Sequence, residues 1–354
     1  MRFIKVGGVK LDAVFACMPM DAIDNLEDCR RLYGDEADNI IRSTGILKRY
    51  YAAKGVSSLD LCVEAANRLF LEYEATRREI GAVLCVTFTP ERPLPANAII
   101  AQHRLGIPTD CLAFDINLAC SGYGYGLWLA ATIARQTGKK VLLLDGDVQS
   151  PWISPYDKST MPVLSDAGTA SLISCDETSD DWFFGFYTNG EGSEILSIQA
   201  GGSGRPVSTD ELKYIEYPDG SKRRSLDIAM DGFEVFRFVA QVVSKKLSDF
   251  ITLSGIDPNE IDVFVPHQAN MYMVRQLAKK IGISQEKVLL SGDKYGNPAS
   301  ASVPLTIASE IVSRLGSKKR SRVLISGFGA GLSISAAMLS IDQEIRSGVF
   351  HYRS

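Results

Sequence analysis

The sequence has few histidines, no closely paired cysteines and no excess of basic charge. Only three of its 354 residues are histidine, and its seven cysteines include no Cys-x-x-Cys pair. Such a composition offers little for a zinc site, and an odd number of cysteines argues against a disulfide framework. Asp145, Asp147 and Asp166 have no accompanying His or Cys cluster, so no metal site is predicted. We expect free, mostly buried thiols in a reducing compartment, the cytoplasm.

The charge balance is mildly acidic, with 38 Lys and Arg against 42 Asp and Glu. Nucleic acid is therefore not expected as a partner, because phosphate binding needs a basic surface. The N-terminus lacks the apolar core and cleavage site of a signal peptide. Residues 323–341 form the one weakly charged run that is long enough to be considered as a membrane span. Their three glycines and four serines favour a buried strand–turn–strand instead, so no membrane partner is predicted.

Short apolar runs alternate with helical patterns along the chain. We predict strands over 82–88, 111–116, 140–148, 170–175, 261–266, 287–292 and 322–328. Their continuous apolar character favours an α/β fold, with layers that cover both faces of the sheets. Apolar residues spaced by three or four predict a helix from Phe233 to Phe250 with a core-packing stripe, and a second helix over 270–281.

The order of elements repeats, which indicates two duplicated halves. Cys120 follows Gly106 by 14 residues, and Asn297 follows Gly282 by 15 residues, each at the entrance to a predicted helix. The repeat predicts that Cys120 and Asn297 occupy equivalent positions. We predict an N-terminal half over 1–175, an irregular connection over 176–225 that covers a site, and a C-terminal half over 226–354.

Cys120 lies between the apolar run CLAFDI and the small-residue run SGYGYG, where a strand becomes a helix. The positive end of a helix favours a thiolate and lowers the pKa of a cysteine there. Small neighbours would admit a substrate carbonyl and let the helix pack deep in the core. These features suit a covalent acyl nucleophile, although a buried cap residue fits the same pattern.

Three further segments carry polar groups at strand or turn ends. His267 follows the strand of VFVPHQAN, and Asn297 stands in the Gly–Asn–Pro turn of DKYGNPASAS. Taken singly, each is more often a structural residue. The run GFGAGLS (327–333) is GxGxG without a following βαβ unit, so it is not a dinucleotide motif. It instead suits a turn that exposes a backbone N–H toward an oxyanion.

The segments DINLACSG, VPHQAN, YGNPASAS and GFGAGLS, taken in order, resemble the β-ketoacyl-ACP synthase III family of the thiolase superfamily. The match runs from STGI (43–46) to GFGAGLS. The resemblance implies a layered αβαβα fold, a homodimer, and substrates that are an acyl-CoA and malonyl-ACP. The expected partners are thus an acyl carrier protein and a coenzyme A thioester, with no bound cofactor.

The resemblance also implies the reaction, a decarboxylative Claisen condensation in fatty-acid or secondary-metabolite biosynthesis. Cys120 would take the acyl group from a thioester, and the backbone N–H groups of Cys120 and Ala330 would form its oxyanion hole. His267 and Asn297 would donate hydrogen bonds to the enolate left when the malonyl thioester loses CO₂. Leu94, from across the dimer, and Phe328 would border the acyl pocket; the small Leu94 predicts acyl groups longer than acetyl.

The sequence departs from the family where coenzyme A and carrier protein bind. Asn39 and Ser43 stand where the family has a Trp and an Arg, which leaves Arg42 and Lys158 as the basic residues for the thioester donor. Arg237, Lys279 and Lys280 match carrier-docking positions, while Tyr272 replaces a docking Arg. The acyl donor is therefore either a CoA ester or an acyl group carried on an acyl carrier protein.

Two other functions remain open. An acyltransferase on the same scaffold would pass the acyl group of Cys120 to an alcohol or amine. A catalytically silent subunit of a hetero-oligomer would only bind. A thiolase proper would need a second reactive cysteine near the C-terminal glycine turn, and no cysteine follows Cys175.

Overall fold

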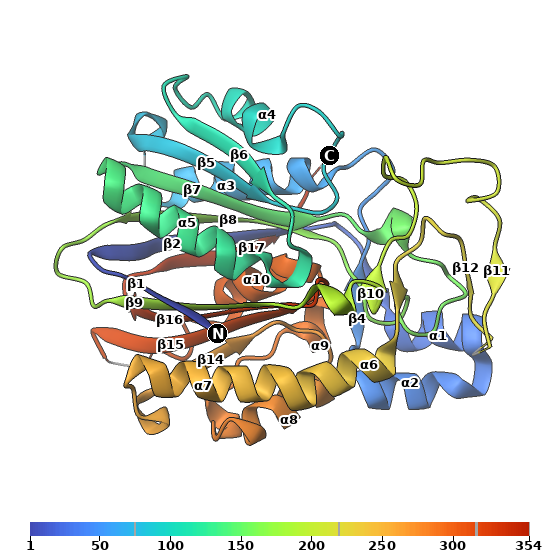
Figure 1. The fold of residues 1–354 in the computed structure, drawn as a ribbon. Helices are drawn as coiled ribbons and strands as arrows, with labels where there is room; N and C mark the ends of the chain where they lie inside the picture. The colour runs from blue at the N-terminus through green and yellow to red at the C-terminus, as the bar shows by residue number, and fades with distance from the viewer. Residues whose placement is uncertain (74–75, 219, 316–317, 354) are drawn as a thin grey trace.

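Two β-sheets lie one above the other in the computed structural model, which describes residues 1–73, 76–218, 220–315 and 318–353 (Figure 1). The first sheet has the order β17-β2-β8-β7-β5-β6, and the second has the order β1-β9-β16-β15-β14. The strands of the first sheet are β2 (Val9–Met18), β5 (Ile80–Val86), β6 (Leu112–Ile116), β7 (Lys140–Asp147), β8 (Ala167–Cys175) and β17 (Arg346–His351). Those of the second are β1 (Arg2–Val6), β9 (Trp182–Thr188), β14 (Val263–Pro266), β15 (Arg320–Gly329) and β16 (Ser333–Asp342).

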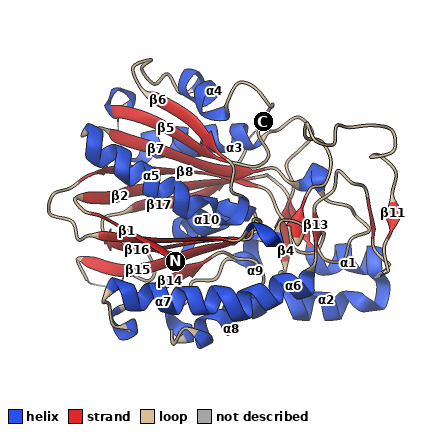
Figure 2. Cartoon of the chain, in the orientation of Figure 1, coloured by secondary structure: helices blue, strands red, loops and turns tan. Residues whose placement is uncertain are grey.

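Helices form three layers around the two sheets (Figure 2). The middle layer holds α5 (Gly122–Thr137) and α10 (Ser302–Glu310), which contact both sheets. One outer layer holds α3 (Ser58–Tyr73) and α4 (Asn97–Arg104) on the first sheet. The other outer layer holds α7 (Ser244–Ser254) and α8 (Met271–Lys280) on the side of the second sheet. This is the αβαβα order of the thiolase-like fold. Among the described residues, no helix combines the length and apolar character that a bilayer crossing requires.

Short elements gather beside one end of the sheets. They are α1 (Asn25–Tyr33), α2 (Ala37–Thr44), α6 (Gly232–Arg237), α9 (Gly292–Tyr295), β3 (Ala22–Asp24) paired with β4 (Lys48–Tyr50), β10 (Leu196–Ser197) paired with β13 (Ala229–Met230), and β11 (Ile215–Glu216) paired with β12 (Lys222–Arg223). A π-helical segment, Phe238–Val243, joins α6 to α7. This end of the molecule holds the candidate active site.

The glycines that follow Cys120 allow α5 to lie between the sheets. A Cβ at Gly126 would lie 2.8 Å from side-chain atoms of Val86 and Leu143 in the first sheet. A Cβ at Gly124 would lie 2.4 Å from Ser335 Oγ in the second sheet. Any side chain at these positions would push α5 off a sheet, so the predicted deep burial of this helix is confirmed.

The two halves repeat the same strand pairings. β5 pairs in parallel with β7, which pairs antiparallel with β8; β14 pairs in parallel with β15, which pairs antiparallel with β16. The counterpart of the β5–β6 pairing is a single parallel bridge between Phe264 and Val288. The predicted strand over 287–292 is therefore wrong, because only Val288 pairs and α9 begins at Gly292.

Three other expectations need correction. The connection predicted to be irregular contains β9, an interior strand of the second sheet. The strand over 111–116 is not covered on all sides, because β6 is a sheet edge with Leu112 50% exposed. The helix stripe is buried only from Phe238 onward, since Phe233 and Phe236 are exposed on α6. The remaining predicted strands and the helix over 270–281 are confirmed.

Candidate active site

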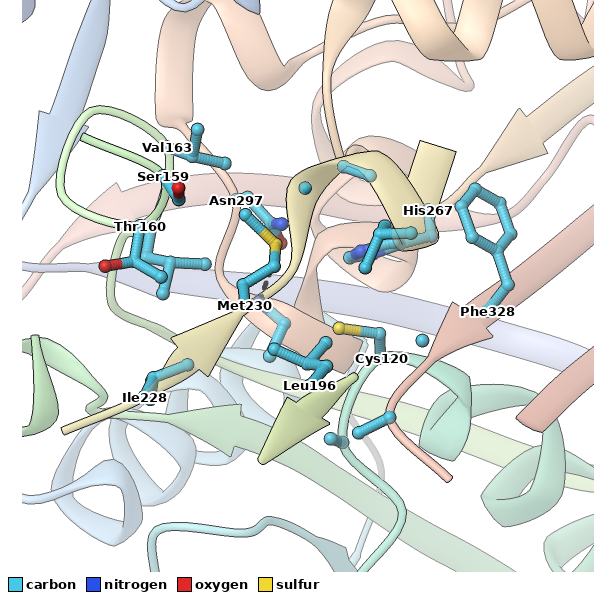
Figure 3. A pocket seen from close by; sticks show the side chains of 18 of the residues that line it. Cys120, Ser159, Thr160, Val163, Leu196, Ile228, Met230, His267, Asn297 and Phe328 are labelled. Atoms are coloured by element: carbon cyan, nitrogen blue, oxygen red, sulfur yellow. Dashed lines mark hydrogen bonds between the residues drawn. The ribbon is translucent and has the colours of Figure 1, made fainter. Parts of the chain in front are cut away.

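A cavity of about 520 Å³ brings Cys120, His267 and Asn297 together from three separate segments. Cys120 lies before α5, His267 after β14, and Asn297 in the turn between α9 and α10. Figure 3 shows the three side chains around one space, with the Cys120 sulfur facing it. The cavity thus joins a nucleophile to two groups that can donate hydrogen bonds.

Cys120 is held in a single 3₁₀ turn, Ala119–Ser121, directly before α5. Gly329 on β15 lies against it: a Cβ there would be 2.8 Å from Cys120 Cβ and 3.1 Å from Cys120 Sγ. Only glycine allows this close approach. The small residue that gives room at the nucleophile is therefore Gly329, while the glycines of α5 serve helix packing.

The enclosure of the Cys120 side chain disfavours its thiolate. Burial raises its pKa from 9.0 to about 12, and the buried carboxyl of Asp147 adds to the rise. A helix N-terminus favours an anion by about 2 kcal/mol at most in a partly buried geometry, whereas this rise corresponds to about 4 kcal/mol. Burial therefore outweighs the helix terminus, and the predicted low pKa of Cys120 is wrong.

His267 is buried and neutral. Burial lowers its pKa to about 3, against a smaller opposing effect from the backbone of Ala299. Its Nδ1 lies 2.7 Å from Ser302 Oγ, and its ring packs against the edge of Phe328 with 5.4 Å between ring centres. A neutral imidazole with one nitrogen held in this way leaves the other for the cavity.

Asn297 is fixed through both its backbone and its side chain. Its N–H donates to the Val163 carbonyl at 3.0 Å, and its carbonyl accepts from Ser165 N–H and Gln149 Nε2. The side-chain Oδ1 accepts the N–H of Ala299 at 3.0 Å. Because the amide oxygen is occupied by this bond, the NH₂ group is the end left for a ligand in the cavity.

The structure changes which residue of the second half matches Cys120. The 3₁₀ turn Ala299–Ala301 precedes α10 as Ala119–Ser121 precedes α5, and both turns open on an alanine with positive φ, 50° and 41°. Ser300 is thus the counterpart of Cys120, and the predicted equivalence of Asn297 is wrong by three residues. Ser300 Oγ donates to Asp145 Oδ1 at 2.5 Å.

Ala330, the second predicted oxyanion donor, lines the cavity beside Gly329. Its carbonyl accepts a hydrogen bond from Ser333 Oγ at 2.7 Å. Ser333 Oγ also lies 2.7 Å from Ser121 Oγ, the residue after the nucleophile. These hydroxyls tie the glycine turn to the nucleophile turn and hold Ala330 beside Cys120.

One side of the cavity is apolar and comes from residues that the sequence did not single out. Leu196 and Ile198 near β10, Ile228 and Met230 near β13, and Val163 line it. The predicted covering role of the connection is met by Leu196 and Ile198. The β10–β13 pair has only two residues in each strand, too short for a periodic signal.

The predicted binding residues fall in different places. Lys158 lines the cavity and pairs with Glu36 at 2.8 Å. Arg42 is exposed on α2, next to the cavity-lining Thr44. Arg237 on α6 pairs with Glu234.

Five of the expected residues do not line the cavity: Arg42, Arg237, Lys279, Lys280 and Leu94. Lys279 and Lys280 lie at the far end of α8 from the cavity, and Lys280 Nζ donates to the Ala240 carbonyl. Leu94 is 83% exposed. Phe328 lines the cavity but lies beside His267.

Neither the thiols nor the buried carboxyls form a metal centre within the described ranges, where no three His, Cys, Asp or Glu residues converge. All seven cysteines are free. Asp147 Oδ1 accepts four hydrogen bonds, from Thr87, Phe88 and Thr89, and burial still raises the pKa of Asp147 to about 7. Asp145 and Asp147 therefore bring limited charge to the region behind Cys120.

Comparisons with known proteins show the family of the chain. The family model described as 3-oxoacyl-[acyl-carrier-protein (ACP)] synthase III matches residues 114–192, and its C-terminal counterpart matches residues 251–341. The β-ketoacyl-[acyl-carrier-protein] synthase III of Rhodopirellula baltica is 32% identical over 94% of this chain and 98% of its own. An acetoacetyl CoA synthase of a Streptomyces species is 30% identical over 86% of this chain and 90% of its own.

A solved structure gives the same result for the fold. The 3-oxoacyl-(acyl-carrier protein) synthase of Burkholderia xenovorans superposes with a TM-score of 0.91, at 31% identity, over 99% of both chains. The fold, the cavity and these relatives lead to one conclusion: the chain belongs to the β-ketoacyl-[acyl-carrier-protein] synthase III family.

Proposed function

We propose that the protein condenses an acyl thioester with a malonyl thioester, with loss of CO₂, in fatty-acid or secondary-metabolite biosynthesis. The observation that carries this proposal is the pair of neutral donors, His267 and Asn297, in the cavity of Cys120. A developing enolate oxygen needs hydrogen-bond donors without a negative charge beside them, and these two groups meet that need. An acyltransferase would not need the pair.

The first half-reaction loads the acyl group. The sulfur of Cys120 attacks the thioester carbonyl, the donor thiolate leaves, and the thiol proton of Cys120 passes to it. Because burial raises the pKa of Cys120 to about 12, the thiolate forms as substrate enters rather than beforehand. The N–H groups of Cys120 and Ala330 would hold the oxyanion of the tetrahedral intermediate.

The second half-reaction forms the new carbon–carbon bond. The C–CO₂ bond of the malonyl group breaks, and its electron pair moves into an enolate whose oxygen accepts from His267 and Asn297. The carbanion carbon then attacks the acyl carbon on Cys120, and the cysteine leaves as a thiolate that takes a proton. The products are CO₂, a 3-oxoacyl thioester and free enzyme.

The part of the cavity lined by Thr44 and Asn270 suits a carried thioester. The end of α2 meets the start of α8 there, where Asn270 Nδ2 donates to the Ser43 carbonyl at 3.1 Å. The exposed Arg42 and Arg275 flank this contact. We propose that they attract the acidic acyl carrier protein, which delivers the malonyl group, and the phosphates of a CoA donor.

We also propose that a second copy covers the edge of the first sheet. β6 ends that sheet with Leu112 50% exposed, and Leu94 is 83% exposed. An apolar edge strand left open invites further pairing. A homodimer through β6 would bury both leucines, and these soluble substrates would place the reaction in the cytoplasm.

Sedimentation tests this interface. Leu112→Lys should convert a dimer into a monomer, whereas Leu71→Lys, at a leucine 70% exposed on α3, should not. Dimers that survive Leu112→Lys would place the interface elsewhere.

The experiment that tests the function measures malonyl-dependent CO₂ release together with the mass of Cys120. The proposal predicts acyl-Cys120 with an acyl thioester alone, and CO₂ with a 3-oxoacyl product once malonyl-ACP is added. Acyl transfer from Cys120 to an alcohol or amine without CO₂ would favour the acyltransferase.

A further inference from the structure

We propose that Ser302 is a positioning residue that holds His267 in the tautomer with its proton on Nε2. Ser302 begins α10, is fully buried and lies one hydrogen bond away from the cavity. Its Oγ is 2.7 Å from His267 Nδ1. The inference rests on the enolate-binding role proposed for His267.

The hydrogen bonds of the Ser302 hydroxyl decide the direction of the contact. Oγ accepts the backbone N–H of Gln268 at 3.3 Å. A hydroxyl has one proton to donate, and His267 Nδ1 is the acceptor that the described part of the chain places within reach. Donation from Ser302 to Nδ1 therefore satisfies the hydroxyl, the imidazole and the Gln268 N–H together.

The reverse direction is less favourable. If Nδ1 carried the proton, Ser302 Oγ would accept twice, and its own proton would be buried without an acceptor. Such an unsatisfied group costs about 1–3 kcal/mol. The Ala299 carbonyl accepts the N–H of Ser302 and has a second lone pair for a protonated ring nitrogen, so it competes with the cavity for a ring N–H.

The tautomer defines what His267 can do in the cavity. With Nδ1 occupied by Ser302, Nε2–H is the end left for substrate, and His267 and Asn297 line the same cavity (Figure 3). Both groups then donate to the same enolate oxygen. In this state His267 cannot accept the Cys120 proton at Nε2, so Ser302 should matter to condensation and little to acyl loading.

Nitrogen NMR of the ¹⁵N-histidine-labelled enzyme reads the tautomer directly. The chain has three histidines, and the signal that is lost in His267→Asn is that of His267. We expect a protonated Nε2 and a bare Nδ1 at neutral pH. A protonated Nδ1 overturns the proposal, and this readout does not depend on catalysis, so its failure is distinct from a failure of the proposed function.

Kinetics test the consequence. Ser302→Ala should lower kcat for condensation about tenfold, with loading of Cys120 little changed, and Ser302→Thr should restore the rate by keeping the hydroxyl. Thr306→Val is the matched control: Thr306 lies one turn along α10, is buried, and bonds to Ser291 and the Ser302 carbonyl. An equal loss of loading and condensation in both Ser302→Ala and Thr306→Val would show a structural role only and overturn the proposal.

Discussion

The side-chain oxygen of Asn297 accepts the backbone N–H of Ala299 at 3.0 Å, and this bond sets which end of the amide faces the cavity. The oxygen is occupied, so the NH₂ group is the end presented to a substrate. The same turn places the backbone of Ala299 next to the His267 ring, so it connects the two segments that supply the hydrogen-bond donors.

Removing the Asn297 amide should separate the two half-reactions. Asn297→Ala should leave acyl loading on Cys120 intact and lower condensation by about 10²–10³-fold, the usual effect of losing one oxyanion donor. Asn297→Asp keeps the size of the side chain, but it loses the donor and adds a negative charge. Its condensation rate should therefore be no higher than that of Asn297→Ala. Intact mass follows loading, and CO₂ release follows condensation. Full condensation by Asn297→Ala would remove Asn297 from the mechanism.

The raised pKa of Cys120 predicts its alkylation profile. Because burial raises this pKa to about 12, the thiolate fraction should grow about tenfold for each pH unit between pH 7 and 10. The rate of iodoacetamide labelling at Cys120, followed by peptide mass spectrometry, should rise without a plateau. Cys120→Ser should abolish that label. A rate that is already constant from pH 7 would restore the low pKa expected at a helix N-terminus.

The buried His267 predicts a loss of stability in acid. An unfolded chain protonates histidine below about pH 6.5, while the native His267 resists protonation until about pH 3. Stability due to this group is therefore complete above pH 6.5 and falls as the pH drops toward 3. Between pH 6.5 and pH 5 the loss is about 2 kcal/mol.

Urea unfolding at pH 7 and pH 5 measures this loss. His267→Gln lacks the titrating ring, so its free energy of unfolding should fall by about 2 kcal/mol less than that of the unmodified protein. Equal losses in the two proteins would mean that His267 titrates normally in the folded state.

The apolar wall of the cavity predicts the accepted acyl length. Leu196, Ile228 and Met230 leave an apolar space in the cavity of Cys120. We expect hexanoyl to decanoyl thioesters to load Cys120, and Met230→Trp to reduce their loading while acetyl loading persists. Good acetyl loading with no medium-chain loading in the unmodified protein would contradict this account.

Much of the molecule could be predicted from sequence because its strands are apolar and its motifs are local. VPHQAN and YGNPASAS each keep their key residue within a few positions of a strand or helix end, so His267 and Asn297 could be placed. The residue of the second half that matches Cys120 could not be predicted exactly. Asn297 and Ser300 lie three residues apart in one turn, and a turn has no periodic pattern that would distinguish them. Met230 was missed because β13 is two residues long, and Ser302 because serine at a helix start is common.

The pKa of Cys120 illustrates a second limit. Its position before a helix is visible in the sequence, but the enclosure that raises the pKa depends on Gly329 and the second sheet. Packing against residues distant in the sequence therefore decides whether the pKa of Cys120 is raised or lowered, and no local sequence pattern shows that packing.

The central claim is that Cys120 takes an acyl group which a decarboxylated malonyl carbon then attacks. The most direct test follows purified enzyme with an acyl thioester and malonyl-ACP, measuring CO₂ and 3-oxoacyl product in the same sample. We predict equal amounts of the two products from the unmodified protein and no 3-oxoacyl product from Cys120→Ser. Acyl-Cys120 that persists in the presence of malonyl-ACP, with neither CO₂ nor 3-oxoacyl product, would contradict the account.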